Sequence, residues 1–91
     1  MKQTTIETIA PIAERILSLR AAADFQYAAA EICEDGSIQG AHAAQSKINV
    51  AIAYQSEATA LHTQARNLCR ANGDSLPGLA GLAAIADSVY A

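Results

Sequence analysis

The chain has 91 residues, with six basic and nine acidic side chains and a formal net charge of −3. This length corresponds to one domain, and the mild acidic balance argues against direct binding to nucleic acid, which normally needs a basic surface. No signal-peptide stretch follows Met1, and the uncharged run over residues 75–86 is well short of the roughly 20 residues that span a bilayer. We therefore expect a cytoplasmic protein with no membrane contact.

The first predicted element is a long helix over about residues 4–34, in a chain rich in alanine, the best helix former. Its start is open to two interpretations. Thr4 and Glu7 fit a capping box, whereas a start at Thr8 would place Pro11 in the first turn. If the helix starts at Thr4, Pro11 lies inside it and should kink it. The pair Asp35-Gly36 predicts the end of the helix.

A second helix is predicted over about residues 38–71. It starts at Ser37 or just after Gly40, and Asn72-Gly73 ends it. The segment 74–77 is a helix-start signal for a short third helix over about residues 77–90. The short connection makes the two long helices antiparallel neighbours. The sequence thus predicts an all-α fold, an antiparallel two-helix hairpin with a short third helix, completed into a bundle by self-association.

One apolar stripe with a three-to-four residue spacing is predicted on each long helix, facing the partner helix. On the first helix it contains Ile6, Ile9, Ala13, Ile16, Ala23, Tyr27 and Ala30, with Arg20 as a polar intruder. On the second helix it contains Ala43, Val50, Tyr54, Ala58, Leu61, Ala65 and Leu68, with Lys47 as the exception. Because alanine buries little apolar area, a hairpin with these stripes alone would be marginally stable.

Four larger apolar residues lie off these stripes, namely Phe25, Ile32, Ile48 and Ile52, all toward the turn of the hairpin. The third helix is about 18 Å long and is tethered at the opposite end, so it cannot reach them. Because chains rarely leave large apolar patches in water, we expect a partner to cover them. The simplest partner is a second copy, which gives a homodimer or a higher homo-oligomer.

Acidic residues surround this predicted surface. Glu31, Glu34 and Asp35 lie at the C-terminal end of the first helix, where negative charge is unfavourable to the helix dipole. An apolar patch with an acidic rim suits a basic protein partner, although a merely solvated turn explains the same residues. The preferred interpretation is a small acidic protein-interaction module that binds a larger protein or complex as an inhibitor, adaptor or regulator. Phage-encoded antagonists of host defence fit this size and charge.

An alternative function follows from the cationic residues His62, Arg66 and Arg70, which recur at every fourth position of the second helix. Arginine forks match phosphate and carboxylate groups, so an oligomeric bundle could sequester a small anion such as a nucleotide there, with Tyr54 or Tyr90 stacked on a ring. The same charges also complement the end of a helix or pair with acids across the hairpin. A second alternative is a structural subunit of a larger particle.

No residue pattern points to catalysis, a cofactor or a metal, so the chain is not expected to be an enzyme. Cys33, Glu34 and His42 flank the turn but lack a fourth ligand and the usual zinc spacing. The hairpin places Cys33 and Cys69 at opposite ends, which argues against an intramolecular disulfide. No family motif is present, and architecture alone does not imply function.

Overall fold

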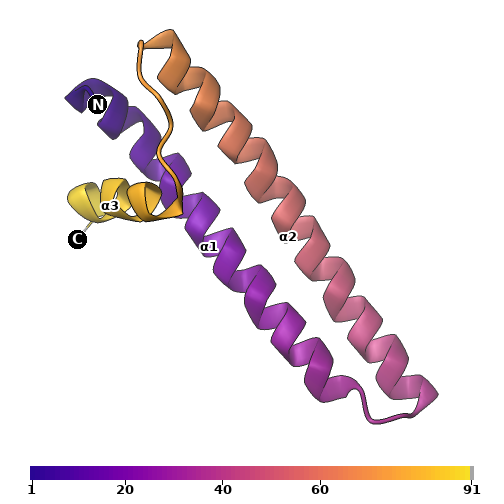
Figure 1. The fold of residues 1–91 in the computed structure, drawn as a ribbon. Helices are drawn as coiled ribbons and strands as arrows, with labels where there is room; N and C mark the ends of the chain where they lie inside the picture. The colour runs from indigo at the N-terminus through magenta and orange to yellow at the C-terminus, as the bar shows by residue number, and fades with distance from the viewer. Residues whose placement is uncertain (91) are drawn as a thin grey trace.

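The computed structural model describes residues 1–90, which form three helices and, within that range, no strand. Helix α1 (Gln3–Cys33) and helix α2 (Ile38–Ala71) run side by side as an antiparallel hairpin, and the short helix α3 (Leu79–Tyr90) crosses the N-terminal half of α1 (Figure 1). The backbone of α3 packs closely against α1, and the buried side chains of α3 belong to the same core cluster as Ala58, Ala65 and Cys69 of α2. The predicted all-α hairpin with a short third helix is confirmed.

Helix α1 begins earlier than either predicted start. Gln3 is its first residue and Lys2 its N-cap, which makes no side-chain capping bond, so the expected Thr4–Glu7 capping box does not define the start. Pro11 lies inside the helix. A start at Thr8 is therefore wrong. Pro11 has no amide hydrogen and leaves the carbonyl of Glu7 without its usual helical donor.

The turn between α1 and α2 is closed by short polar contacts. Ser37 is the N-cap of α2, and its hydroxyl accepts a hydrogen bond from the backbone amide of Gly40 at 2.9 Å, which decides between the two predicted starts. The carboxylate of Asp35 accepts from the backbone amide of Ser37 at 2.9 Å. Gly36 has a φ of 85°, a left-handed conformation that glycine adopts without steric cost. Helix α2 ends at the predicted Asn72-Gly73 pair, where Gly73 has a φ of 74°.

Small residues spaced by sevens form the interface between the two long helices. Ile9, Ile16, Ala23 and Ala30 are buried on α1, and Ala44, Ala51, Ala58 and Ala65 are buried on α2. A seven-residue repeat keeps one face of each helix toward its partner, as in a coiled coil. The stripe predicted on α2 is wrong at its start, because Ala43 is exposed and Val50 is 40% exposed. The buried stripe runs one position later, since small alanines rather than the larger Val50 fit between closely spaced helices.

The larger core residues are confined to the half of the hairpin that α3 covers. Leu82, Ile85 and Ala86 of α3 join the same buried cluster as Ile9 and Ile16 of α1. Leu19 and Ala10 of α1 and Cys69 of α2 complete that half. The predicted limit of α3 is thereby confirmed. It covers the half that holds the termini, and the buried residues of the turn half are alanines.

The molecule is a thin rod. Its principal extents are 53 × 24 × 15 Å and its radius of gyration is 16.5 Å, against about 12 Å for a compact chain of this length. The turn half consists only of two helices side by side (Figure 1). Every residue in that half therefore lies close to solvent on at least one side.

Candidate functional site

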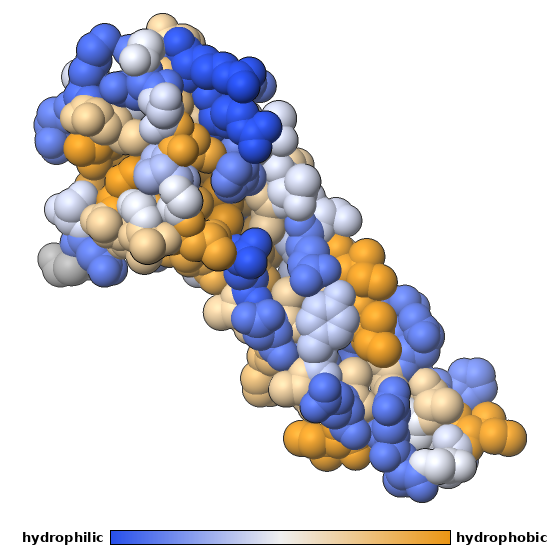
Figure 2. Space-filling model, viewed as in Figure 1, coloured by the Kyte–Doolittle hydropathy of each residue, from blue (hydrophilic) through white to orange (hydrophobic). Residues whose placement is uncertain are grey.

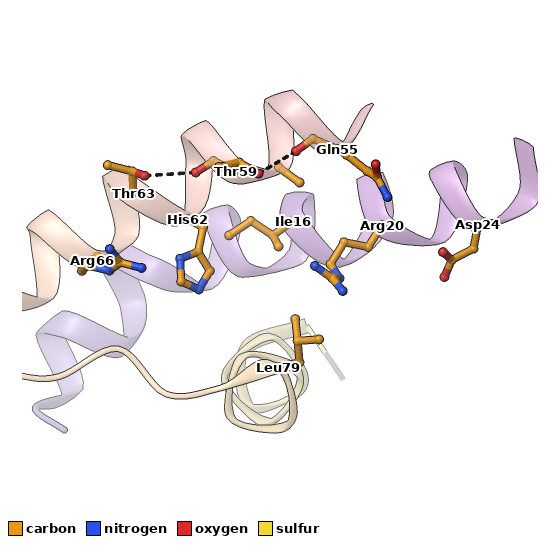
Figure 3. A pocket seen from close by; sticks show the side chains of 10 residues that line it. Ile16, Arg20, Asp24, Gln55, Thr59, His62, Thr63, Arg66 and Leu79 are labelled. Carbon is orange, nitrogen blue, oxygen red and sulfur yellow. Dashed lines mark hydrogen bonds between the residues drawn. The ribbon is translucent and has the colours of Figure 1, made fainter. Parts of the chain in front are cut away.

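A pocket of about 510 Å³ opens where α1, α2 and the start of α3 meet. Ile16 and Ala58, both buried, form its apolar floor, and Leu79 of α3 lies across from them (Figure 3). Its remaining lining residues are polar: Arg20 and Asp24 from α1, and Gln55, Thr59, His62, Thr63 and Arg66 from α2. A volume in this range is typical of small-molecule sites.

Three basic residues from two helices line this space. His62 and Arg66 come from α2 and Arg20 from α1, with Ile16 between His62 and Arg20 (Figure 3). Two of the three residues of the predicted anion site, His62 and Arg66, are thus in one pocket. The third, Arg70, is exposed and does not line it.

Arg20 is the residue that the sequence analysis missed. Arg20 interrupts the apolar stripe of α1. Because this stripe faces α2, the Arg20 side chain lies at the edge of the interface between the two helices. A lone arginine in an otherwise apolar stripe is the sequence signal that could have identified it. A second long helix was needed to show that Arg20 faces His62 and Arg66 across a shared hollow.

The polar lining groups are partly committed to other bonds. The Thr59 and Thr63 hydroxyls donate to the carbonyls of Gln55 and Thr59, at 2.9 and 3.2 Å. The Gln55 side-chain oxygen accepts from the Tyr27 hydroxyl at 3.0 Å, which leaves its amide nitrogen free to donate. The threonine oxygens are left as acceptors, so the arginines, the histidine and the Gln55 amide are the donors available to a ligand.

The charges of the pocket are not neutralised by ion pairs. Residues 1–90 contain one ion pair, between Arg15 and Glu57 at 3.3 Å, and neither residue lines the pocket. The expected pairing of the α2 cations with acids across the hairpin is therefore not found in the described chain. Tyr54 and Tyr90, expected to stack on a ligand in the anion-binding alternative, do not line the pocket either.

The four apolar residues predicted to bind a partner all lie in the turn half. Phe25 and Ile32 are 71% and 84% exposed, Ile52 is 49% exposed, and Ile48 is half-buried. They lie on two faces. Phe25 and Ile32 follow the buried Ala23 and Ala30 by two residues, which places them on the outer face of α1, whereas Ile48 and Ile52 share the helical face of the pocket residues Gln55 and Thr59.

The three acidic residues near the turn differ in their roles. Glu31 and Glu34 are exposed. The carboxylate of Asp35 instead accepts hydrogen bonds from the hydroxyl and backbone amide of Ser37, and these bonds hold the pKa of Asp35 below its ordinary value. Asp35 thus has a structural role in starting α2, and Glu31 and Glu34 are the acids left free for a partner.

Both cysteines are free thiols, Cys33 half-buried and Cys69 buried. No three His, Cys, Asp or Glu side chains in the described part of the chain come together in a way that could hold a metal ion. None of the helices formed by residues 1–90 combines the length and the apolar character needed to span a bilayer. No protein-family model, curated protein or solved structure matches this chain.

Proposed function

We propose that this protein is a small helical interaction module whose first step is self-association, through the outer face of α1 in the turn half, and that the resulting dimer binds a larger protein through its acidic turns. The observation that carries the proposal is the distribution of apolar residues. The turn half buries alanines and exposes its largest apolar side chains, Phe25 and Ile32.

The outer face of α1 is apolar over more than three turns. At a spacing of three to four residues it presents Ala21, Ala22, Phe25, Ala28, Ala29 and Ile32. The outer face of α2 differs, because it contains Asn49, Ser56, Gln64 and Asn67. Orange patches on the arm of the hairpin beyond α3 show apolar side chains at the surface of the turn half (Figure 2).

This face is complementary to itself. Phe25 and Ile32 protrude, and the alanines beside them leave room for a protruding side chain from another helix. Around a two-fold axis, Phe25 of one copy would pack beside Ala28 and Ala29 of the other. The two α1 helices would then run antiparallel, which places the two acidic turns at opposite ends of the dimer and avoids repulsion between them.

The exposed surface is consistent with a missing partner. The chain exposes 5644 Å², about 600 Å² more than a compact monomer of 9.4 kDa. A stable protein interface of standard size covers about 800 Å² on each partner. Association along α1 would cover a comparable area and give Phe25 and Ile32 the apolar surroundings that α3 does not provide.

The test is sedimentation equilibrium over a range of protein concentrations. We expect the wild-type chain to reach twice its mass of 9.4 kDa, and the double variant Phe25→Glu/Ile32→Glu to remain a monomer. The control Gln64→Glu/Asn67→Glu adds the same charge on the outer face of α2 and should still dimerise. Circular dichroism should show that both variants stay helical, since all four positions are exposed.

Three outcomes would contradict the proposal. A wild-type chain that stays monomeric at every concentration would exclude self-association. If the double variant still dimerised, the interface would have to lie on another face, such as the one that carries Ile48 and Ile52. A mass that grows with concentration without a plateau would favour the alternative in which the chain is a subunit of a larger particle.

A further inference from the structure

We infer that the pocket between α1, α2 and the start of α3 is a binding site for a small organic phosphate of about nucleotide size. This site lies where the start of α3 meets the two long helices, on a different side of α1 from the outer face proposed above for association. The inference is independent of the proposed function, because neither Phe25 nor Ile32 lines the pocket.

The first argument is that basic side chains from two helices line one hollow. Arg66 and His62 project from α2, and Arg20 projects from α1 into the same hollow (Figure 3). Arg20 and Arg66 are exposed and make no ion pair within residues 1–90. Guanidinium groups match phosphate oxygens in pairs of parallel hydrogen bonds, so Arg66, with His62 beside it, can hold a phosphate, and Arg20, on the other side of Ile16, can donate to a further oxygen of the same elongated ligand (Figure 3).

The second argument is the apolar part of the pocket. A site for inorganic phosphate alone would need only the charged groups. Here Ile16, which is 1% exposed, and Ala58, which is 5% exposed, form a floor, and Leu79 lies opposite. Leu79 is 46% exposed, so a ligand body inserted beside it would remove apolar surface of Leu79 from water and rest against the floor.

The third argument is the length of the pocket and the order of the polar groups along it. The lining residues of α2 extend from Gln55 to Arg66, which corresponds to about 16 Å along the helix. Arg66 and His62 lie at one end of the row and Asp24 at the other (Figure 3). The Asp24 carboxylate accepts hydrogen bonds and does not donate them, so it would repel a phosphate but suits a hydroxyl or amino group at the far end of an elongated ligand. The pocket therefore fits a molecule with a phosphate at one end and donor groups at the other.

The experiment is isothermal titration of the full chain with three organic phosphates, namely adenosine 5′-monophosphate, uridine 5′-monophosphate and glucose 6-phosphate. Adenosine and inorganic phosphate, the two halves of adenosine 5′-monophosphate, are titrated separately as controls. We expect at least one of the organic phosphates to bind, and both halves to bind at least about tenfold more weakly, because each lacks one set of contacts.

Variants then locate the site. Arg66→Gln and Arg20→Gln should each weaken the binding by about tenfold or more, because each removes a charge-assisted pair of hydrogen bonds. Arg70→Gln is the matched control. It removes the same charge from the same helix four residues further on, outside the pocket, and should leave the affinity within about twofold of the wild type. The variant Phe25→Glu/Ile32→Glu should also still bind, which separates this inference from the proposed dimer.

The inference fails if none of the three organic phosphates binds. It also fails if inorganic phosphate binds as tightly as the organic phosphates, because the apolar floor then contributes nothing. Equal losses of affinity in Arg66→Gln and Arg70→Gln would show that the general positive charge of α2 attracts the ligand, and would overturn the assignment of the binding site to the pocket.

Discussion

The hydroxyl of Thr5 donates a hydrogen bond to the carboxylate of Asp74 at 2.7 Å, between residues 69 positions apart in the chain. Thr5 is buried in the first turn of α1, and Asp74 belongs to the connection that leads from α2 to α3. Beside this bond, the Lys2 ammonium donates to the Asn72 carbonyl at 2.7 Å. The beginning of the chain thus holds the α2–α3 connection and sets where α3 starts.

This contact predicts how stability depends on pH. The hydrogen bond from Thr5 and, to a smaller extent, the backbone amide and charge of Lys2 hold the pKa of Asp74 below its ordinary value of 3.8. A carboxylate whose folded pKa is lowered stabilises the fold fully above the unfolded value, and this contribution is lost as the pH falls from 3.8 through the folded pKa. We expect the melting temperature to fall in that range.

The variant Asp74→Asn isolates this effect. It should melt at a lower temperature than the wild type at neutral pH and should show a smaller decrease below pH 3.8, measured by thermal unfolding at several pH values. The Asp35 carboxylate, whose pKa is also lowered, should account for part of the decrease that remains. Identical pH profiles for Asp74→Asn and the wild type would contradict the role given to Asp74.

The alanine interface predicts a strong effect of added volume. Ala51 is fully buried between α1 and α2 in the turn half. In Ala51→Leu the larger side chain would force the helices apart, at a cost of about 1–3 kcal/mol in the free energy of unfolding. Chemical denaturation measures this loss.

The matched control is Ala60→Leu, which adds the same atoms at an exposed position of α2. It should change the free energy of unfolding by no more than about 0.5 kcal/mol. If both variants had the same stability, the close approach of the two helices at Ala51 would be wrong.

The two thiols should react at different rates. Cys33 is half-buried beside the turn, whereas Cys69 is fully buried, and burial, followed by the charge of Asp74, raises the pKa of Cys69. Since the thiolate is the reactive form, iodoacetamide should modify Cys33 first and Cys69 only after unfolding, as followed by mass spectrometry. The variant Cys33→Ser should then stay unmodified in native buffer. Fast modification of Cys69 in that variant would show that the end of α2 opens readily.

Much of the fold could be predicted from local signals. The bounds of α2 follow from the sequence, because local residue preferences fix both ends. Gly36 and Ser37 stand before its start, and the Asn72-Gly73 pair ends it. The start of α1 could not be predicted in this way. Lys2 is held by contacts with Asn72 and Asp74, and residues so far apart in the chain leave no local pattern.

The candidate pocket was predicted only in part, for a related reason. A spacing of four residues identifies His62 and Arg66 as neighbours on one helix, and it includes Arg70 on the same grounds. The positions of α1 and Leu79 decide which of these residues line the hollow. That depends on the packing of all three helices, which also brings Arg20 to the site.

The close packing of the α3 backbone on α1 has a consequence for exchange between the pocket and solvent. Because the close backbone contacts of α3 in the described chain are with α1, a local opening of α3 would leave the pairing of α1 with α2 in place. Leu79 would leave with it, whereas Arg20, His62 and Arg66 would keep their places on the hairpin. The hairpin thus supplies the basic side chains and the Ile16–Ala58 floor, and α3 supplies only Leu79, so an opening of α3 would admit or release a ligand without unfolding the hairpin.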